Sequence, residues 1–257
     1  MAEAKTTTGG RAAIFGAPLS WIAIFGAVLG ATAIIPMIYY MEGGAVFPLA
    51  TSLLPLTGLV LGPYAGAVAG LIGGIIGLFI NPSAFSTGAL GIIDSWILPP
   101  LAAGLIANKK WYALVPVWII LSAIWLTVPY SWPGPPAFPP ADPNMWIGIA
   151  WMVGGGLFIT VVLGYKFLNN WLRTEDPKRL FVAVFFVAWV AREIGHLMGW
   201  IWYDIYFSFP PSLNIWLGEF AVPWQATIFY VVSAIIGTAI LRGLKRSGLK
   251  KIPRAVW

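Results

Sequence analysis

The sequence predicts an all-α integral membrane protein with about eight transmembrane helices and both termini in the cytoplasm. Its 257 residues are 59% hydrophobic and only 9% charged, with a mean hydropathy of +0.83, whereas soluble domains carry roughly 25% charged residues. The apolar residues form runs of about 20, the length that an α-helix needs to cross a bilayer. The 15 lysines and arginines gather beside those runs. The net charge of +6 therefore reflects membrane topology, and no nucleic-acid partner is expected.

Eight apolar segments make up the predicted membrane domain, 14–242, which lies between an N-terminal tail, 1–13, and a basic tail, 243–257. The first segment is longer than the apolar region of a signal peptide, and no small-x-small cleavage site follows it, so we expect a retained helix. The second and third segments are separated by Gly62-Pro63, a tight turn because proline cannot continue the preceding helix. We expect two short helices there, with a re-entrant pair as the alternative. The predicted helices cover residues 14–40, 47–62, 64–80, 89–107, 111–130, 145–168, 180–206 and 220–242.

The basic residues test the count of eight. An even number of crossings places both termini on one side of the membrane, and 14 of the 15 basic residues then fall on that side. The exception is Arg192. The positive-inside rule assigns the basic side to the cytoplasm. The residues that follow this assignment are Lys5, Arg11, Lys109, Lys110, Lys166, Arg173, Lys178, Arg179, Arg242, Lys245, Arg246, Lys250, Lys251 and Arg254.

The predicted outer loops are rich in proline and aromatic residues. Segment 131–143, SWPGPPAFPPADP, has six prolines, so it is expected to form a stiff extended cover, neither helix nor central strand. Segment 207–218, FSFPPSLNIWLG, is a second such loop. Together with segment 41–48, MEGGAVFP, the proline-rich loop 131–143 is expected to gate a site that is open to the outside.

Two predicted helices carry a small residue at every fourth position. Such a stripe allows another helix to approach closely. The alanine stripe of the first helix is predicted to dock a partner protein, with packing inside this protein as the alternative. The glycine stripe lies in the middle of the predicted bundle and is expected to pack internally. The stripe residues are Ala23, Ala27 and Ala31 in the first helix, and Gly62, Gly66, Gly70 and Gly74 in the third.

The run FPLATSLLPLTGLVLGPYAGAVAGLIGGIIG, residues 47–77, resembles the second and third helices of the substrate-binding S components of energy-coupling-factor transporters. That family shows an apolar helix ending in Leu-Gly-Pro and then a glycine- and alanine-rich helix, and LGPYAGAVAG at 61–70 has this pattern. The segment ALGIIDSWILPPLAAGLIANKKW at 89–111 resembles the family's fourth helix and its basic turn. The alanine stripe is similar to the family motif that faces the coupling subunit. The resemblance extends over residues 14–130.

The resemblance implies a membrane subunit that captures a small molecule, often a vitamin, from the outside. It also implies a prokaryotic cytoplasmic membrane and delivery of the solute by docking to a transmembrane coupling subunit that separate ATPases drive. The chain differs from the family in three respects. S components usually have six helices, many carry an acidic residue in the glycine-rich helix, and the cobalt and nickel members have a histidine-bearing N-terminus. Vitamin-like solutes are therefore expected, and cobalt and nickel are not.

The segment VAWVAREIGHLMGWIWYD, residues 187–204, places ionisable residues inside an apolar helix. An ionised side chain at mid-bilayer costs at least about 2.5–3.5 kcal/mol, so such residues must face protein, water or each other. At about 100° per residue, Glu193, His196 and Asp204 fall on one face together with Trp200, and Arg192 lies at the flank of that face. We expect this stripe to supply the polar contacts of a solute cavity, with Trp200 as a stacking surface. The predicted solute-binding residues are Arg192, Glu193, His196, Trp200 and Asp204.

Two other roles are compatible with the stripe. The first is structural ion pairing, with Asp94 or Gln225 as partners, because the adjacent residues Arg192 and Glu193 do not face each other. The second is a proton relay or a metal site. A Glu-x-x-His pair binds metal in di-iron bundles, but with a second copy and further carboxylates. This chain has one histidine, His196, and no cysteine, so we expect no metal.

These features favour a solute-binding membrane subunit that is not an enzyme and holds no cofactor. The first alternative is a non-transporting accessory subunit of a larger membrane complex, in which the charges of the seventh helix are structural. A weaker one is an intramembrane enzyme that uses Glu193 and His196. The chain has no Gly-x-x-x-x-Gly-Lys-Ser/Thr phosphate loop and no Gly-x-Ser-x-Gly elbow. The expected partners are the bilayer, a small-molecule solute and a coupling subunit with its ATPases.

Overall fold

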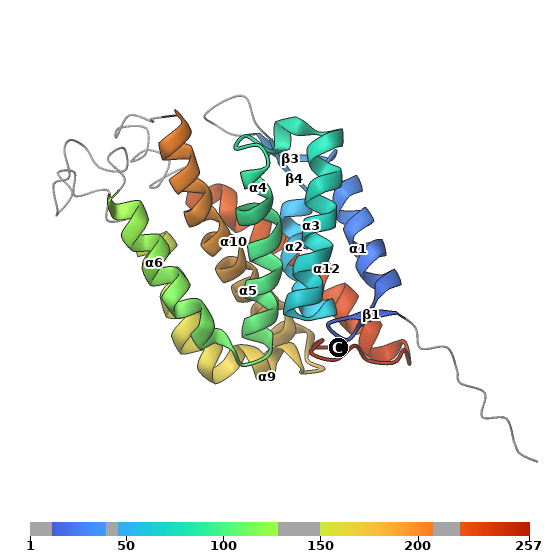
Figure 1. Ribbon diagram of the computed structural model, residues 1–257. Helices are drawn as coiled ribbons and strands as arrows, with labels where there is room; N and C mark the ends of the chain where they lie inside the picture. Colours follow the sequence, from blue (N-terminus) through green and yellow to red (C-terminus); the bar gives the residue numbers. More distant parts are fainter. Residues whose placement is uncertain (1–11, 40–45, 128–149, 208–221) are drawn as a thin grey trace, which may run out of the picture.

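A computed structural model describes residues 12–39, 46–127, 150–207 and 222–257, and every structural statement below concerns those residues. They fold into a bundle of helices with two short antiparallel hairpins (Figure 1). In chain order, the elements are β1 (Ala13–Ile14), β2 (Ala17–Pro18), α1 (Leu19–Thr32), β3 (Pro36–Tyr39), β4 (Val46–Pro48), α2 (Ala50–Leu61), α3 (Pro63–Ile80), the 3-10 helix η1 (Pro82–Ala84), α4 (Leu90–Ile92), the π-helix η2 (Ile93–Ile97), α5 (Leu98–Ala107), the 3-10 helix η3 (Trp111–Ala113), α6 (Leu114–Thr127), the π-helix η5 (Ala150–Gly155), α8 (Gly156–Phe158), the π-helix η6 (Ile159–Leu168), α9 (Asn169–Leu172), α10 (Pro177–Phe207) and α12 (Val222–Arg246).

Five helical stretches of the described chain are long and apolar enough to cross a membrane, which agrees with the predicted class of all-α membrane protein. Three further apolar helices are shorter, with 10 to 17 residues. The five long stretches are Pro63–Ile80, Leu90–Ala107, Ala150–Leu172, Pro177–Phe207 and Pro223–Arg246, and the shorter ones are Leu19–Thr32, Ala50–Leu61 and Trp111–Trp125.

The first predicted helix, 14–40, is wrong at both ends. Its N-terminal residues form the hairpin β1–β2, with Phe15 at φ 53° and Gly16 at φ 88° in the turn. Its C-terminal residues form β3, which pairs with β4. Pro18 and Pro36 explain both limits, because proline disfavours the helical conformation in the residue before it and offers no backbone N–H. The remaining helix, α1, has 14 residues and is about 21 Å long, which is shorter than a bilayer core of about 30 Å.

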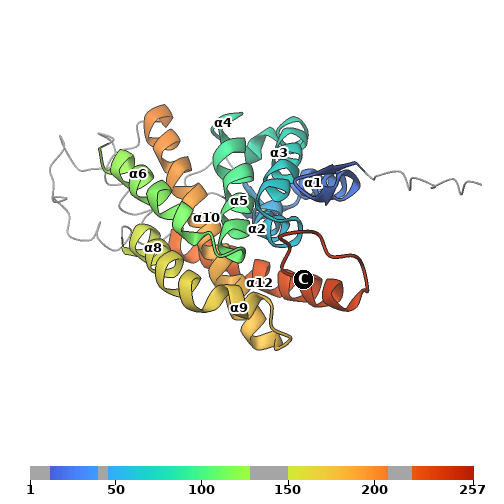
Figure 2. The ribbon, with the colours of Figure 1, turned by 60° about the horizontal axis from the view of Figure 1, so that its bottom comes forward.

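Helix α10 lies at the centre of the bundle and α1 lies at its edge (Figures 1 and 2). Helix α10 packs against α12, α5, α6 and α2, whereas α1 packs chiefly against α3. With 31 residues, α10 is about 46 Å long, so it exceeds the thickness of a bilayer core. Because α10 is packed on several sides, the polar stripe that the sequence places in this helix lies inside the protein.

The glycines of α3 lie where its neighbours come closest. A Cβ on Gly66 would be 2.7 Å from the Cα of Gly58 in α2, and a Cβ on Gly70 would overlap the carbonyl oxygen of Trp96. On another side of α3, a Cβ on Gly73 would be 2.6 Å from the Cβ of Leu29 in α1. Of the predicted stripe, Gly74 faces Trp96 as well, and Gly62, at φ 85°, forms the turn between α2 and α3. These contacts place α3 between α1 on one side and α2 and η2 on the other.

The two ends of the described chain meet at one end of the bundle. A Cβ on Gly16 would lie 3.2 Å from Cγ of Pro253. The C-terminal residues then pack into the protein: the backbone N–H of Val256 donates to the Leu59 carbonyl at 3.0 Å, and Nε1 of Trp257 donates to the Val60 carbonyl at 3.0 Å. The Leu59 carbonyl lacks its helical donor because the residue four positions later is Pro63. The predicted cytoplasmic tail 243–257 thus ends in a buried segment.

The turn after α5, the start of α10 and the end of α12 lie at this same end, which is called the basic end below because these described segments carry lysines and arginines (Figure 1, bottom). Hydrogen bonds join its segments: Asn108 donates to the Arg254 carbonyl at 2.9 Å, Arg173 to the Ala107 carbonyl at 2.9 Å, and Lys245 to the Thr174 carbonyl at 2.6 Å. Of the basic residues that the structure describes, only Arg192 lies within the bundle, buried in α10. The predicted outer loops, 131–143, 207–218 and 41–48, lie outside the described residues except for Phe207 and the strand β4.

Candidate functional site

A cavity lies at the end of the bundle opposite the basic end, between α10, η2, η1 and β4. It has a volume of about 50 Å³ for the centres of water-sized molecules, which is room for several waters or one polar group of a solute. A smaller neighbouring cavity, of about 20 Å³, shares part of its wall. The larger one is lined by Phe47, Ala84, Phe85, Ser86, Thr87, Gly91, Asp94, Ser95, Arg192, His196, Gly199, Trp200 and Tyr203.

The sequence around Asp94 explains how this carboxylate reaches the cavity. Asp94 lies in the π-helical turn η2. Two prolines follow, Pro99 and Pro100, so the carbonyls four residues before them have no backbone donor, and the helix widens at this point. Across the cavity wall, α10 has glycines at positions 195 and 199. A Cβ on Gly195 would overlap the Asp94 carbonyl oxygen, and a Cβ on Gly199 would lie 3.2 Å from Asp94 Oδ2. These two glycines allow η2 and α10 to touch and bring the carboxylate against α10.

Two charged groups of the cavity wall are buried with unused hydrogen-bonding atoms. Asp94 is 1% exposed and its Oδ1 has no hydrogen-bond partner; Arg192 is 8% exposed and its Nε has none. Neither side chain forms an ion pair with another described residue. The guanidinium of Arg192 lies over two aromatic rings instead, 5.0 Å from the centroid of Phe47 and 5.7 Å from that of Phe229. Cation–π contact stabilises the charge of Arg192 without using its N–H donors.

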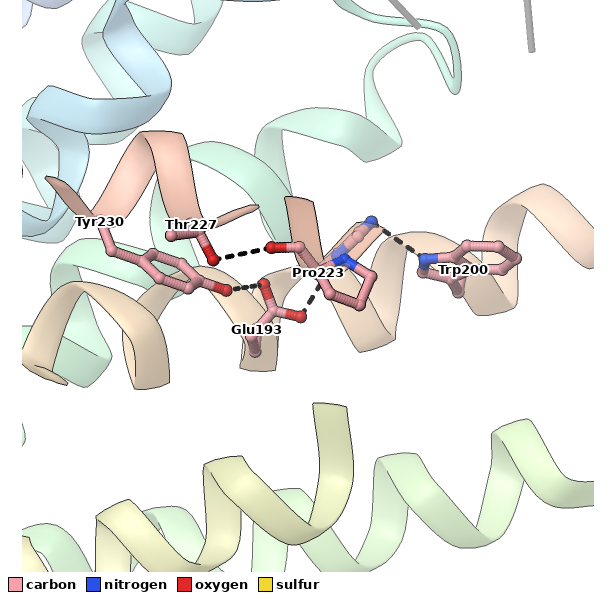
Figure 3. Close-up of polar contacts among 6 residues, drawn as sticks. Glu193, Trp200, Pro223, Thr227 and Tyr230 are labelled. Carbon is pink, nitrogen blue, oxygen red and sulfur yellow. Dashed lines mark hydrogen bonds and ion pairs between the residues drawn. The ribbon is translucent and has the colours of Figure 1, made fainter. Parts of the chain in front are cut away.

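The neighbouring carboxylate, Glu193, is fully engaged by protein (Figure 3). The hydroxyl of Tyr230, in α12, donates to Glu193 Oε1 at 2.5 Å, and Nδ1 of His196 faces Oε2 at 3.4 Å. Nε1 of Trp200 donates to His196 Nε2 at 2.9 Å. An indole N–H only donates, so His196 Nε2 must carry a lone pair. The imidazole is therefore neutral with its proton on Nδ1, where it points at Glu193. We call these four residues the Glu193 chain.

The structure divides the predicted site residues into two groups. Arg192, His196 and Trp200 line the cavity. Glu193 does not border it, because its side chain faces Tyr230 on α12. Asp204 is also absent from the wall and is fully buried. The face of α10 toward the cavity therefore starts at Arg192 and continues through Tyr203.

Of the wall residues, the sequence analysis predicted only Arg192, His196 and Trp200 as solute contacts. Those it missed include Phe85, Asp94 and Tyr203. The sequence analysis names Asp94 only as an ion-pair partner. The hydroxyl of Tyr203 donates to Ser86, which joins α10 to the loop before α4. The signal that was available is the pair of glycines four residues apart in α10, Gly195 and Gly199, since such a pair marks a close helix contact.

Among the described residues, no three His, Cys, Asp or Glu side chains converge on one point. Both ring nitrogens of His196 already face protein partners. On the cavity wall, Oδ1 of Asp94 can accept a hydrogen bond and the N–H of Arg192 Nε can donate one.

The alanine stripe lies on the outer face of α1. Ala23, Ala27 and Ala31 are all exposed, beside Ile24 and Val28, which are 60% and 47% exposed. The inner face of the same helix meets α3 through Gly26 and Gly30.

Comparisons of the chain with protein-family models, curated proteins and solved structures found no match.

Proposed function

We propose that this protein is a solute-binding membrane subunit that captures a small, vitamin-like molecule from the outside for ATP-driven uptake through a separate coupling subunit. The observation that carries the proposal is the pairing of Asp94 and Arg192 at one cavity. Both are buried, both have unused hydrogen-bonding atoms, and they carry opposite charge. A buried polar atom without a partner costs about 1–3 kcal/mol, and more when the group is charged. A solute that completes these hydrogen bonds recovers that cost on binding.

The chemistry of the wall defines the solute. It must offer an N–H or O–H donor to Asp94 Oδ1 and an acceptor to the N–H of Arg192 Nε, since a carboxylate only accepts and a guanidinium only donates. The rings of Phe85 and Trp200 line the same cavity and offer apolar surface to a planar group. An amide-bearing heterocycle or a small zwitterion meets all three conditions, and its polar end is the part that fits the cavity.

The topology proposed with this function has eight crossings and both termini in the cytoplasm. It is supported by the meeting of residues 13–18 with the C-terminal segment at the basic end, and by the positive-inside rule. The three short apolar helices then cross the membrane only as parts of the bundle. In this orientation the cavity opens toward the outside, as capture of an external solute requires.

The exposed alanine stripe of α1 supplies the proposed docking surface for the coupling subunit. Its small side chains leave the backbone of α1 accessible to a second helix, and small residues are the usual contacts between helices in a membrane. Support comes from Ala23, Ala27 and Ala31, which face away from α3 while the glycines of α1 face toward it.

Recovery of the bound solute tests the proposal. The protein is purified in mild detergent from cells grown on rich medium, and the small molecules released by denaturation are identified by mass spectrometry. We expect a solute in stoichiometric amount from the wild type and at least tenfold less from Arg192→Gln. The matched control is Arg179→Gln, which removes an exposed arginine from the start of the same helix. If the wild type releases no molecule and binds none of the common vitamins, the proposal is wrong.

Co-purification tests the partner. We expect ATPase subunits and a membrane coupling subunit to accompany the wild type but not Ala27→Trp, while Phe79→Trp, at an 80% exposed position on α3, retains them. Recovery of other membrane proteins without any ATPase would replace transport by the role of an accessory subunit.

A further inference from the structure

A second pocket lies at the basic end, between the turn that follows α5 and the helices η6 and α9. Its volume, about 250 Å³ for the centres of water-sized molecules, exceeds that of the cavity described above. The lining consists of two lysines, two asparagines and two aromatic residues, with no acidic side chain: Lys109, Trp111, Tyr165, Lys166, Asn169 and Asn170.

The two lysines of this pocket are held in place by different elements. Lys109 adopts a left-handed conformation, φ 59°, at the end of α5. The backbone N–H groups of Lys109 and Lys110 donate to the Ile106 and Leu105 carbonyls at 3.1 and 2.8 Å, which closes the turn. Lys166 belongs to η6 and faces the same pocket. Neither Lys109 nor Lys166 forms an ion pair within the described chain.

The aromatic residues place this pocket at the boundary of the membrane. The rings of Trp111 and Tyr165 meet edge to face, with centroids 6.0 Å apart, and tyrosine and tryptophan are enriched at the headgroup level. The helices that continue from the pocket expose apolar side chains, among them Val162 on η6 (38%), Phe158 on the adjoining α8 (57%) and Ile120 on α6 (57%). A ligand whose charged group enters the pocket would thus have an apolar helix surface beside it.

We propose that this pocket binds the phosphate headgroup of an anionic phospholipid, whose acyl chains then lie along η6 and α6. Basic pockets between transmembrane helices on the cytoplasmic side suit anionic headgroups. The lysines neutralise the phosphate, and the amide N–H group of exposed Asn170 and the Trp111 indole N–H are donors near the glycerol oxygens. The bound lipid links the α5–α6 turn to η6, two segments that Figure 2 shows side by side at the basic end. This inference is independent of the solute site.

Lipid retention measured by native mass spectrometry tests this site. The purified full-length protein is mixed with phosphatidylglycerol or phosphatidylcholine in detergent, and bound lipid is counted as a function of concentration. We expect the double variant Lys109→Asn, Lys166→Gln to bind phosphatidylglycerol roughly 30-fold more weakly, because each basic residue near an anionic lipid contributes a factor of about 5. Asparagine is chosen at position 109 because it tolerates the left-handed conformation. The matched control is Lys250→Gln, Lys251→Gln, which removes two exposed lysines outside the pocket.

Three results would overturn the assignment. One is equal binding of phosphatidylglycerol by the wild type and the pocket variant at unchanged melting temperature. A second is an equal loss in the control, which would reduce the effect to overall charge. The third is displacement of the lipid by millimolar inorganic phosphate, which would identify a soluble anion as the ligand. The assignment is supported if only the pocket variant loses affinity for phosphatidylglycerol and its binding of phosphatidylcholine does not increase.

Discussion

Two neighbouring residues of α10, Arg192 and Glu193, are both charged and both buried in the bundle, yet their surroundings are opposite. Glu193 has a protein partner on each carboxylate oxygen, whereas Arg192 has a donor without an acceptor and faces a cavity with Asp94. A helix turns by about 100° per residue, so one step along the chain moves the side chain from the contact with α12 to the cavity wall. Burial alone therefore does not identify a binding residue. What separates these two residues is that Arg192 has an unused donor and also lines the cavity.

This contrast predicts different consequences for mutations on the two sides. A buried polar group whose hydrogen bonds are complete specifies the packing of its neighbours, and its loss leaves another buried group unsatisfied. A buried charge that lacks partners already carries a cost, so its removal should affect binding more than stability.

The largest effect is expected for Asp94→Asn on the cavity side. The amide keeps the size of the carboxylate but loses its charge, and hydrogen bonds to charged groups contribute about 1.5–3 kcal/mol. The affinity for the solute recovered from the wild type should fall about 10- to 150-fold, as measured by isothermal titration calorimetry. The melting temperature should stay the same or rise. Unchanged affinity with a lower melting temperature would assign Asp94 to structure and remove it from the site.

The next effect is expected for Tyr230→Phe in the Glu193 chain. Without the hydroxyl, Glu193 Oε1 remains buried and unsatisfied, so the free energy of unfolding should fall by about 1–3 kcal/mol. Solute affinity should change by less than about threefold, because Tyr230 does not border the cavity. Thermal melting in detergent measures the first quantity. Tyr39→Phe, at a position in β3 that is also 69% exposed and outside both pockets, is the control and should leave the melting temperature unchanged. A Tyr230→Phe variant as stable as this control would show that the Glu193 chain does not stabilise the fold.

Trp200→Phe tests the point where the two sides meet, because Trp200 lines the cavity and also donates to His196. Phenylalanine keeps an aromatic ring in the wall but removes the N–H. We expect a loss of about 1 kcal/mol in the free energy of unfolding, the value of one neutral hydrogen bond, and a reduction in affinity of only a few-fold. A loss of affinity as large as that of Asp94→Asn would mean that the Glu193 chain also takes part in binding.

The class of fold was predictable because it depends on composition and on the length of apolar runs, and the turn at Gly62-Pro63 was predictable because proline leaves few alternatives. The ends of the first helix were not. Residues 14–18 and 33–40 are as apolar as the helix between them, and hydropathy does not distinguish a hairpin from a helix where backbone partners decide the outcome. Pro18 and Pro36 were the available signals for those limits.

The site was predictable in part for a similar reason. The angular pattern of α10 brought the stripe residues to one side of the helix, but a sector of about 80° at about 100° per residue is wide enough to include both a cavity wall and a helix contact. The positions of η2 and α12 decide which stripe residue faces the cavity and which faces another helix. That packing depends on Gly195, which meets the backbone of Asp94, and on Tyr230, whose hydroxyl reaches Glu193. Both contacts involve residues outside α10, so the spacing of residues within that helix cannot predict them.

Gly199→Ala should produce the smallest effect and examines the distance between α10 and η2 directly. The added methyl group would lie 3.2 Å from Asp94 Oδ2 and 3.7 Å from its Cγ, a tight contact that the carboxylate relieves by moving a few tenths of an ångström. Alanine also gains roughly 0.5–1 kcal/mol over glycine in a helix interior, which offsets the crowding. The control is Gly243→Ala in α12, where the methyl group would have no neighbour within 4 Å, so the helical gain appears alone. We expect Gly199→Ala to be less stable than this control by under about 1 kcal/mol and to bind solute a few-fold more weakly. If both variants bind as the wild type does, the position of the Asp94 carboxylate does not limit binding. The cavity side of α10 then tolerates small shifts of its side chains better than the Glu193 side does.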